Sequence, residues 1–128
     1  MILGVKALEL PWRVVGINVC DDRDYFVRVI GEIVEGAIER FHLGLPFDRS
    51  EIEILDGYVG LGYAKSRPEE LALIRDVARA EGLILDPVYT GKAMFGLHSE
   101  LRAGRDLGKQ LVFVHTGGQP AIFTWNQL

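Results

Sequence analysis

The sequence predicts an α/β protein of three layers, in which a mostly parallel sheet lies between helices on both of its faces. One observation behind this prediction is that β-branched runs alternate with amphipathic stretches along the chain, as in successive βαβ units. Another is the stretch RVVGINVC at 13–20, whose near-continuous apolarity is typical of a strand covered on both sides. The 128 residues suit a single α/β domain spanning 1–128.

The first helix is expected directly after this strand. The aspartates at 21–22 can cap it, and apolar residues recur at three- and four-residue spacing over 26–41. The stretch EIEILDGYVG at 51–60 alternates charged and apolar residues, which predicts a second strand. This strand leads into a glycine-rich loop at 57–65.

Two further helices have recognisable ends. Ser66 and Glu69 have the spacing of a capping box, and the helix that they open should stop at Gly82. Thr90 is placed to cap another helix, which should run to Gly104.

Two short extended segments complete the expected fold. The first is LILDPVY at 83–89, because Pro87 disfavours a helical conformation at Asp86. The second is the apolar strand LVFV at 111–114, which runs straight into the polar, glycine-paired step HTGG at 115–118.

Composition excludes several classes of protein. The 14 basic and 18 acidic residues are not gathered into blocks, so neither nucleic acid nor a membrane is expected as a partner. A single cysteine, Cys20, excludes an internal disulfide framework and fits the cytoplasm, and three scattered histidines predict no metal site. The opening segment 1–12 contains charges and no cleavage signal, so it is read as neither a signal peptide nor a membrane span.

Polar side chains gather at three expected exits from the sheet: the loop 57–65, the turn 86–90 and the step 115–118. Because ligands of open α/β sheets bind at the carboxyl ends of the strands, these exits could line one crevice. Their hydroxyl and imidazole groups suit a polar heteroaromatic ligand. The side chains concerned are Tyr58 or Tyr63, Tyr89, Thr90, His115 and Thr116.

Each exit also has a purely structural explanation. Tyr63 can be an ordinary loop residue, 86–90 can be a turn that caps a helix, and the glycines of 115–118 can allow positive φ with a half-buried histidine beside them. A P-loop is excluded, because the spacing is absent and Ala93 follows Lys92 where a hydroxyl residue is required.

Four stretches together resemble the C-terminal part of the D-cysteine desulfhydrase and 1-aminocyclopropane-1-carboxylate deaminase family. They are RVVGINV, GYVGLGY, EGLILDPVYTGKAMFGL and LVFVHTGGQPAIF. The family consists of pyridoxal-phosphate enzymes of the tryptophan-synthase β type, so the resemblance implies part of a fold type II domain. It also implies deamination of a small amino acid, with β-elimination from D-cysteine to pyruvate, sulfide and ammonia as the first expectation.

The resemblance assigns roles to individual residues. Tyr89 and Tyr63 match tyrosines that face the reacting part of the substrate, and Thr116 matches the hydroxyl presented to the pyridine nitrogen. Thr90 stands where the deaminase branch carries a glutamate, which favours the desulfhydrase branch. The cofactor-binding residues expected in all are Thr116, Thr90, His115, Gly117 and Gly118.

The resemblance also implies that the site is incomplete in this chain. The segment 1–12 looks like the end of a helix, and the family's cofactor-binding lysine and phosphate loop are expected upstream of it. The chain alone is therefore expected to bind no pyridoxal phosphate and to be inactive. Its expected partners are the remaining part of the enzyme and further copies of itself. Two alternatives remain open: a remnant that binds a ligand or a protein without catalysis, and a truncated domain with no function.

Overall fold

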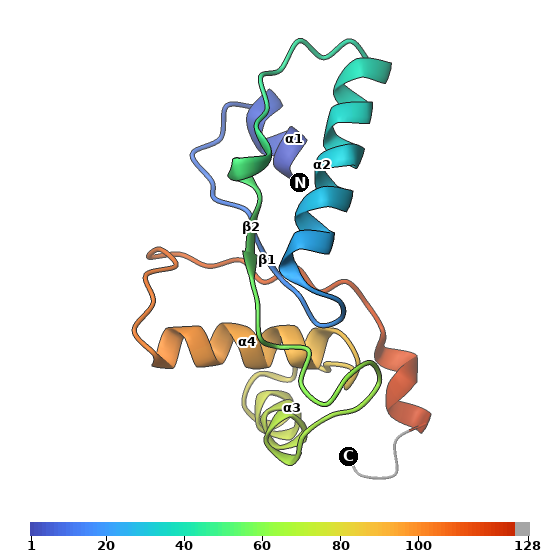
Figure 1. The fold of residues 1–128 in the computed structure, drawn as a ribbon. Coiled ribbons are helices and arrows are strands. Elements are labelled where there is room, and N and C mark those ends of the chain that lie inside the picture. Colours follow the sequence, from blue (N-terminus) through green and yellow to red (C-terminus); the bar gives the residue numbers. More distant parts are fainter. Residues whose placement is uncertain (125–128) are drawn as a thin grey trace.

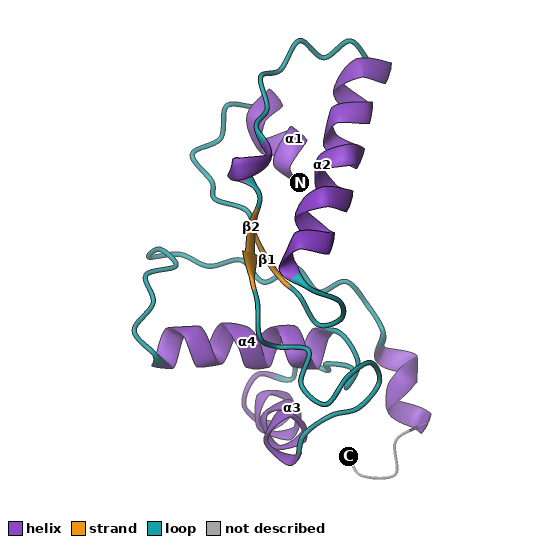
Figure 2. Ribbon diagram, viewed as in Figure 1, coloured by secondary structure: helices purple, strands orange, loops and turns teal. Residues whose placement is uncertain are grey.

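A computed structural model describes residues 1–124 and contains helices and a small sheet joined by long loops (Figures 1 and 2). Helices α1 and α2 lie toward one end of the sheet, whereas α3 and α4 lie beyond its other end (Figure 1). The elements in chain order are α1 (Ile2–Ala7), β1 (Val15–Ile17), α2 (Arg23–Arg40), η1 (Arg49–Glu51), β2 (Glu53–Leu55), α3 (Pro68–Glu81), α4 (Thr90–Arg102) and η2 (Gln119–Thr124), where η denotes a 3-10 helix.

The sheet of the described residues has two parallel strands, β1 and β2, joined through α2 in a βαβ unit. Val15 lies opposite Glu53, and Ile17 lies opposite Leu55. The parallel direction predicted from the sequence is therefore confirmed for this pair. Both strands are shorter than predicted, at three residues each.

The predicted strand at 111–114 does not form in the described part of the chain, and this prediction was wrong for the chain as it stands. Val112 is 89% exposed, while Phe113 packs against the small core of Leu71, Ile74 and Leu85. A strand needs a neighbouring strand to bond with its backbone N–H and C=O groups. An apolar β-branched run indicates that a segment prefers the extended conformation, but it does not provide the strand with which that segment would pair. The three-layer architecture is accordingly reduced to a mixed α/β arrangement with a two-stranded sheet.

Helix α2 follows the sequence prediction closely. Asp22 is its N-cap and accepts a hydrogen bond from the Tyr25 backbone N at 2.8 Å, as expected for a capping aspartate. Gly31 and Val34 are buried against the rest of the protein, which confirms the predicted apolar side. Ile33 is 65% exposed, so the buried side of α2 is narrower than the apolar stripe that the sequence predicts.

Helix α3 begins one residue later than predicted. Its N-cap is Arg67, whose backbone N donates to Glu70 Oε2 at 2.8 Å. Ser66 has a different role, because its hydroxyl donates to the Pro87 carbonyl oxygen at 2.6 Å and so joins α3 to the turn before α4. The predicted stop is confirmed, since Gly82 ends α3 in the left-handed conformation with φ +66°.

Thr90 does not cap α4, contrary to the prediction, because it is the first helical residue. The capping carboxylate is that of Asp86, four residues earlier, whose Oδ2 accepts from the Thr90 backbone N at 2.8 Å. The segment at 83–86 that leads to it lies outside the helices and strands.

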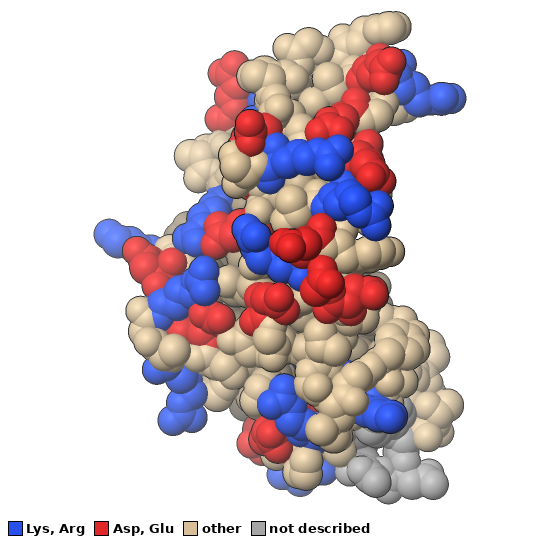
Figure 3. All heavy atoms as spheres, viewed as in Figure 1, with Lys and Arg blue, Asp and Glu red and all other residues tan. Residues whose placement is uncertain are grey.

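The surface of the described residues carries both charges and large apolar side chains. Acidic and basic residues alternate over the face seen in Figure 3, and neither sign forms a continuous patch there. Several apolar side chains are more than half exposed, among them Trp12 at 66%, Phe41 at 65% and Phe123 at 90%. No helix within residues 1–124 is both long and apolar enough to cross a bilayer.

Candidate active site

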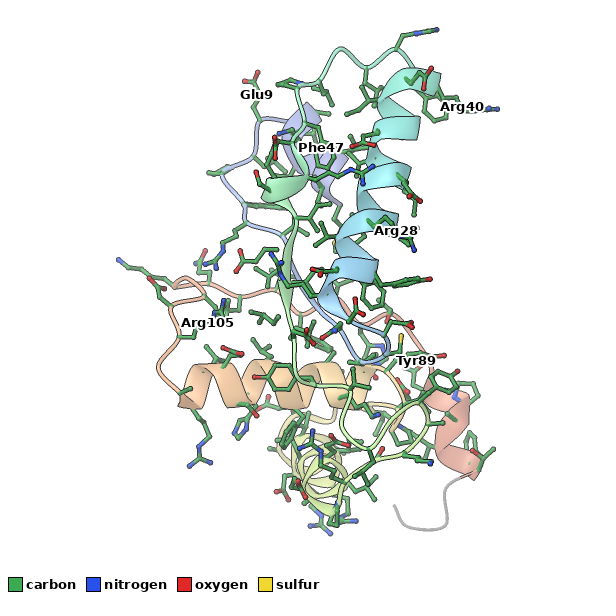
Figure 4. The ribbon with its side chains drawn as sticks, viewed as in Figure 1. Glu9, Arg28, Arg40, Phe47, Tyr89 and Arg105 are labelled. Atoms are coloured by element: carbon green, nitrogen blue, oxygen red, sulfur yellow. The ribbon has the colours of Figure 1, made fainter. Side chains whose placement is uncertain are left out.

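The three polar exits predicted from the sequence come together at the N-terminal end of α4. Tyr89, immediately before α4, lies where the loop ahead of α3 and the segment leading to η2 approach that helix (Figure 4). Hydrogen bonds and close contacts join the loop 57–65 and the step 115–118 to the turn at 86–90. The three segments therefore meet, although they lie up to about 60 positions apart in the sequence, and a single ligand-binding crevice between them stays a prediction.

Two tyrosines face each other at the centre of this convergence. The Tyr63 and Tyr89 hydroxyls are 2.5 Å apart, and their rings meet edge to face with centroids 5.9 Å apart. Tyr63 is 62% exposed and Tyr89 is 41% exposed, so both rings are accessible from outside. The hydrogen bond with Tyr63, assisted by partial burial, raises the pKa of Tyr89 above its ordinary value. The two hydroxyls therefore form a hydrogen bond at an accessible position, and either of them can be the donor.

Tyr58, the other tyrosine of the glycine-rich loop, is directed elsewhere. Its hydroxyl donates to Glu100 Oε1 at 2.7 Å, near the far end of α4. Burial and this hydrogen bond raise the pKa of Tyr58 to about 12. Of the two alternatives left open by the sequence, the structure therefore brings Tyr63 and not Tyr58 to Tyr89.

Asp86 fixes the turn that carries Tyr89. Its buried carboxylate accepts hydrogen bonds from the backbone N of Val88 at 2.8 Å and of Tyr89 at 2.7 Å, both at Oδ1. Burial opposes ionisation of Asp86, but the bonds from the hydroxyl and amide of Thr90 and from these two amides hold its pKa below the usual value. The sequence analysis treated Asp86 only as a turn residue and missed this role.

The Thr90 hydroxyl is engaged inside the same turn. It accepts from the Asp86 backbone N at 2.9 Å and donates to Asp86 Oδ2 at 2.6 Å, and the residue is only 2% exposed. These contacts give Thr90 a part in holding Tyr89 in place. Contact between Thr90 and a cofactor stays a prediction.

The step 115–118 is attached to this turn and to the segment before it. His115 Nδ1 accepts from the Gly117 backbone N at 3.1 Å, so Nε2 carries the proton and donates to the Ile84 carbonyl oxygen at 2.8 Å. Thr116 is exposed, and its hydroxyl has no hydrogen-bond partner among residues 1–124. His115 therefore anchors the step, and contact between Thr116 and a cofactor stays a prediction.

The two glycines of this step have different environments. Gly118 has φ +90°, and a Cβ there would lie 2.7 Å from the Asp86 carboxylate, so glycine is required by packing as well as by conformation. Gly117 has φ +99° with open space where a Cβ would stand. Only Gly117 thus leaves room beside it for a ligand to approach the backbone.

A second residue that the sequence analysis set aside lies beneath the loop that carries Tyr63. Lys92 is completely buried, and its Nζ donates to the carbonyl oxygens of Val59 and Gly62, both at 2.7 Å. Burial lowers the pKa of Lys92 below its usual value, an effect that nearby Glu70 only partly offsets. The sequence carried one sign that Lys92 would be buried, because Lys92 and Gly96 are four residues apart and therefore lie on the same side of a helix. In the structure both residues are buried, and α4 packs closely at Gly96.

The observed arrangement defines a class of site: a cluster of accessible hydroxyl groups at the beginning of a helix in a mixed α/β fragment. A search of protein-family models finds no match. Relatives are nevertheless clear. The mitochondrial bifunctional D-cysteine desulfhydrase/1-aminocyclopropane-1-carboxylate deaminase of Arabidopsis thaliana is 38% identical over 123 residues, which are 94% of this chain and 29% of that protein.

Bacterial proteins and a solved structure agree with this relationship. The 1-aminocyclopropane-1-carboxylate deaminase of Rhizobium radiobacter is 35% identical over 123 residues, covering 95% of this chain and 36% of its own length. The D-cysteine desulfhydrase of Yersinia pestis is 32% identical over 127 residues, covering 98% and 38%. The crystal structure of an ACC deaminase homologue superposes with a TM-score of 0.76 at 37% identity, over 91% of this chain and 34% of that one.

The chain is therefore homologous to one part of the 1-aminocyclopropane-1-carboxylate deaminase and D-cysteine desulfhydrase family. It spans 29% to 38% of the length of these relatives. The family resemblance stated from the sequence motifs is confirmed at this level.

Proposed function

We propose that this chain is the C-terminal part of a pyridoxal-phosphate enzyme that deaminates a small amino acid, by β-elimination of the kind that D-cysteine desulfhydrases perform. The observation that carries the proposal is the hydrogen-bonded pair Tyr63–Tyr89, placed beside the step that bears the exposed Thr116. The homology to desulfhydrases and deaminases over nearly the whole chain supports it.

The groups at the site suit one side of a pyridine ring and its substrate. Thr116 has an exposed hydroxyl that would hold the ring nitrogen, and Gly117 has no atoms near the position of a Cβ that would keep the ring away. A neutral hydroxyl leaves that nitrogen largely unprotonated, which is adequate when a good leaving group such as a thiol departs. Pyridoxal phosphate, when bound, supplies the electron sink for bond cleavage at the substrate's α-carbon.

The tyrosine pair would transfer protons next to the substrate. Because the two hydroxyls already share a hydrogen bond, either phenol can donate while the other stabilises the oxygen that remains. The buried carboxylate of Asp86 would keep Tyr89 in position throughout.

Other parts of the proposed enzyme must come from outside this chain. Lys92 is buried and bonded to two carbonyl oxygens, so we assign it no covalent contact with a cofactor. We propose that the covalent lysine, the phosphate-binding loop and further parallel strands are supplied by the rest of the enzyme. Pairing of 111–114 with such a strand would restore a larger, mostly parallel sheet, and the exposed apolar side chains favour self-association of the completed enzyme.

The first test asks whether the isolated chain fixes the cofactor. Pyridoxal phosphate followed by borohydride should label no lysine stoichiometrically, as judged by peptide mapping. The chain is then fused to the polypeptide encoded directly upstream, and sulfide and pyruvate are measured with D-cysteine as substrate. A fusion that binds the cofactor yet releases neither product contradicts the proposal and favours a remnant that binds without catalysis.

Replacing Thr116 with valine separates a chemical role from a structural one. Since its hydroxyl is exposed and unpaired within residues 1–124, the free energy of unfolding should change by less than about 0.5 kcal/mol. In the fused enzyme the same change should shift the absorption of bound cofactor and slow elimination. Loss of stability with unchanged absorption and rate would instead show that Thr116 serves the fold.

A further inference from the structure

Lys92 is an unusual residue to find completely buried. A buried ammonium group is costly unless it is paired, and no carboxylate within residues 1–124 lies at ion-pair distance from its Nζ. Its hydrogen bonds go to two backbone carbonyl oxygens, those of Val59 and Gly62, at 2.7 Å each. The energetic cost of burial is therefore offset by contacts with a single segment, the loop that precedes α3.

The loop is also held by Tyr58, which is bonded to Glu100, and by Tyr63, which is bonded to Tyr89, so Lys92 acts on the segment between these two anchors. Within it, the Gly62 backbone N donates to the Val59 carbonyl oxygen at 3.3 Å, and the Lys65 backbone N donates to the Gly62 carbonyl oxygen at 3.2 Å. Gly60 and Gly62 have positive φ, and Leu61 is 61% exposed. A glycine-rich loop of this kind has many accessible conformations, so fixing two of its carbonyl groups strongly restricts it.

Lys92 connects the two segments that carry the tyrosines. Its backbone belongs to the first turn of α4, three residues after Tyr89, and its Nζ holds the carbonyl of Gly62, which directly precedes Tyr63. We infer that Lys92 is a positioning residue that sets the distance between the Tyr63 and Tyr89 hydroxyls by holding the loop at 59–62 against the first turn of α4. The catalytic consequence of this inference rests on the proposed function, whereas the geometric part does not.

The inference is tested first on the 128-residue chain. Lys92→Met keeps the length and apolar stem of the side chain and removes both hydrogen bonds. The titration of Tyr89 is followed by NMR of ¹³Cζ-labelled tyrosine, assigned with Tyr89→Phe. Because the bond with Tyr63 raises the pKa of Tyr89, its loss should shift the titration downward, toward the value of about 10 for an unperturbed tyrosine.

Three further variants make the result specific. Tyr63→Phe should shift the Tyr89 titration in the same direction, and adding Lys92→Met to it should produce no further shift. Lys92→Gln, which retains a donor of shorter reach, should give a smaller shift than Lys92→Met. Lys65→Met, at an exposed lysine of the same loop, should leave the titration unchanged.

The outcomes separate the inference from the proposed function. A Tyr89 titration that is unchanged in folded Lys92→Met and Lys92→Gln overturns the inference, and so does unfolding of both variants, since the lysine would then serve the fold as a whole. In a fused enzyme that retains Tyr89, Lys92→Met should lower kcat. If the unaltered fusion shows no elimination, the proposed function fails, and the titration result still decides the role of Lys92.

Discussion

If this chain completes the enzyme proposed above, replacing Tyr89 with phenylalanine is expected to lower the rate of elimination by ~10²- to 10⁴-fold, the usual contribution of a general acid or base. The change removes the hydroxyl that lies 2.5 Å from that of Tyr63 and leaves the ring and its edge-to-face contact in place. Since both rings are accessible, the substitution should slow proton transfer and leave the stability of the fold unchanged. Sulfide release from D-cysteine, measured over a pH series, provides the assay.

Tyr58→Phe is the matched control for this prediction. It removes a tyrosine hydroxyl from the same loop region, but one that is bonded to Glu100 at 2.7 Å and not to Tyr89. We expect it to cost about 1 kcal/mol of stability and to leave the rate of the folded enzyme unchanged. Equal rates for Tyr89→Phe and the unaltered enzyme would remove Tyr89 from the mechanism.

Replacing Asp86 with alanine should have the largest effect on stability, lowering the free energy of unfolding by about 3 to 5 kcal/mol. The carboxylate is fully buried and accepts four hydrogen bonds, from the backbone N of Val88, Tyr89 and Thr90 and from the Thr90 hydroxyl. Alanine would leave these donors without their acceptor and would remove the side chain against which Gly118 packs. Urea denaturation followed by circular dichroism measures the loss.

Asp22→Ala is the comparison that isolates the effect of burial. Asp22 also caps a helix, but it is exposed and accepts a single bond from the Tyr25 backbone N, so its removal should cost ~1 kcal/mol. If the two alanine variants lose similar stability, the buried network around Asp86 is not the anchor that its geometry indicates.

The Asp86 network also predicts how stability depends on pH. Because the folded-state pKa of Asp86 is lowered, its contribution is fully present above the unfolded value of about 3.9 and is lost as the pH falls through the folded pKa. Acid should therefore destabilise the unaltered chain more than the Asp86→Ala variant. Parallel acid denaturation curves for the two chains would contradict this assignment.

The local structure of this protein could be predicted from the sequence where the signal acts within one helical turn. Asp22 caps α2 and Gly82 ends α3 as expected, because a capping carboxylate or a left-handed glycine needs only its nearest backbone groups. The motifs around Tyr89 and His115 likewise led to the correct family, since a short run of residues is enough to indicate relatedness.

Only the tertiary structure decided how distant segments meet. It selected Tyr63 over Tyr58 as the neighbour of Tyr89, and it placed Lys92 beneath a loop some 30 positions earlier in the chain. It also left 111–114 without a strand partner, although the apolar pattern there was that of a strand. In each case the outcome depends on a partner that is remote in sequence. Periodicity and capping patterns describe what a segment prefers, whereas the burial of a charge or the pairing of a strand depends on which other groups fold against it.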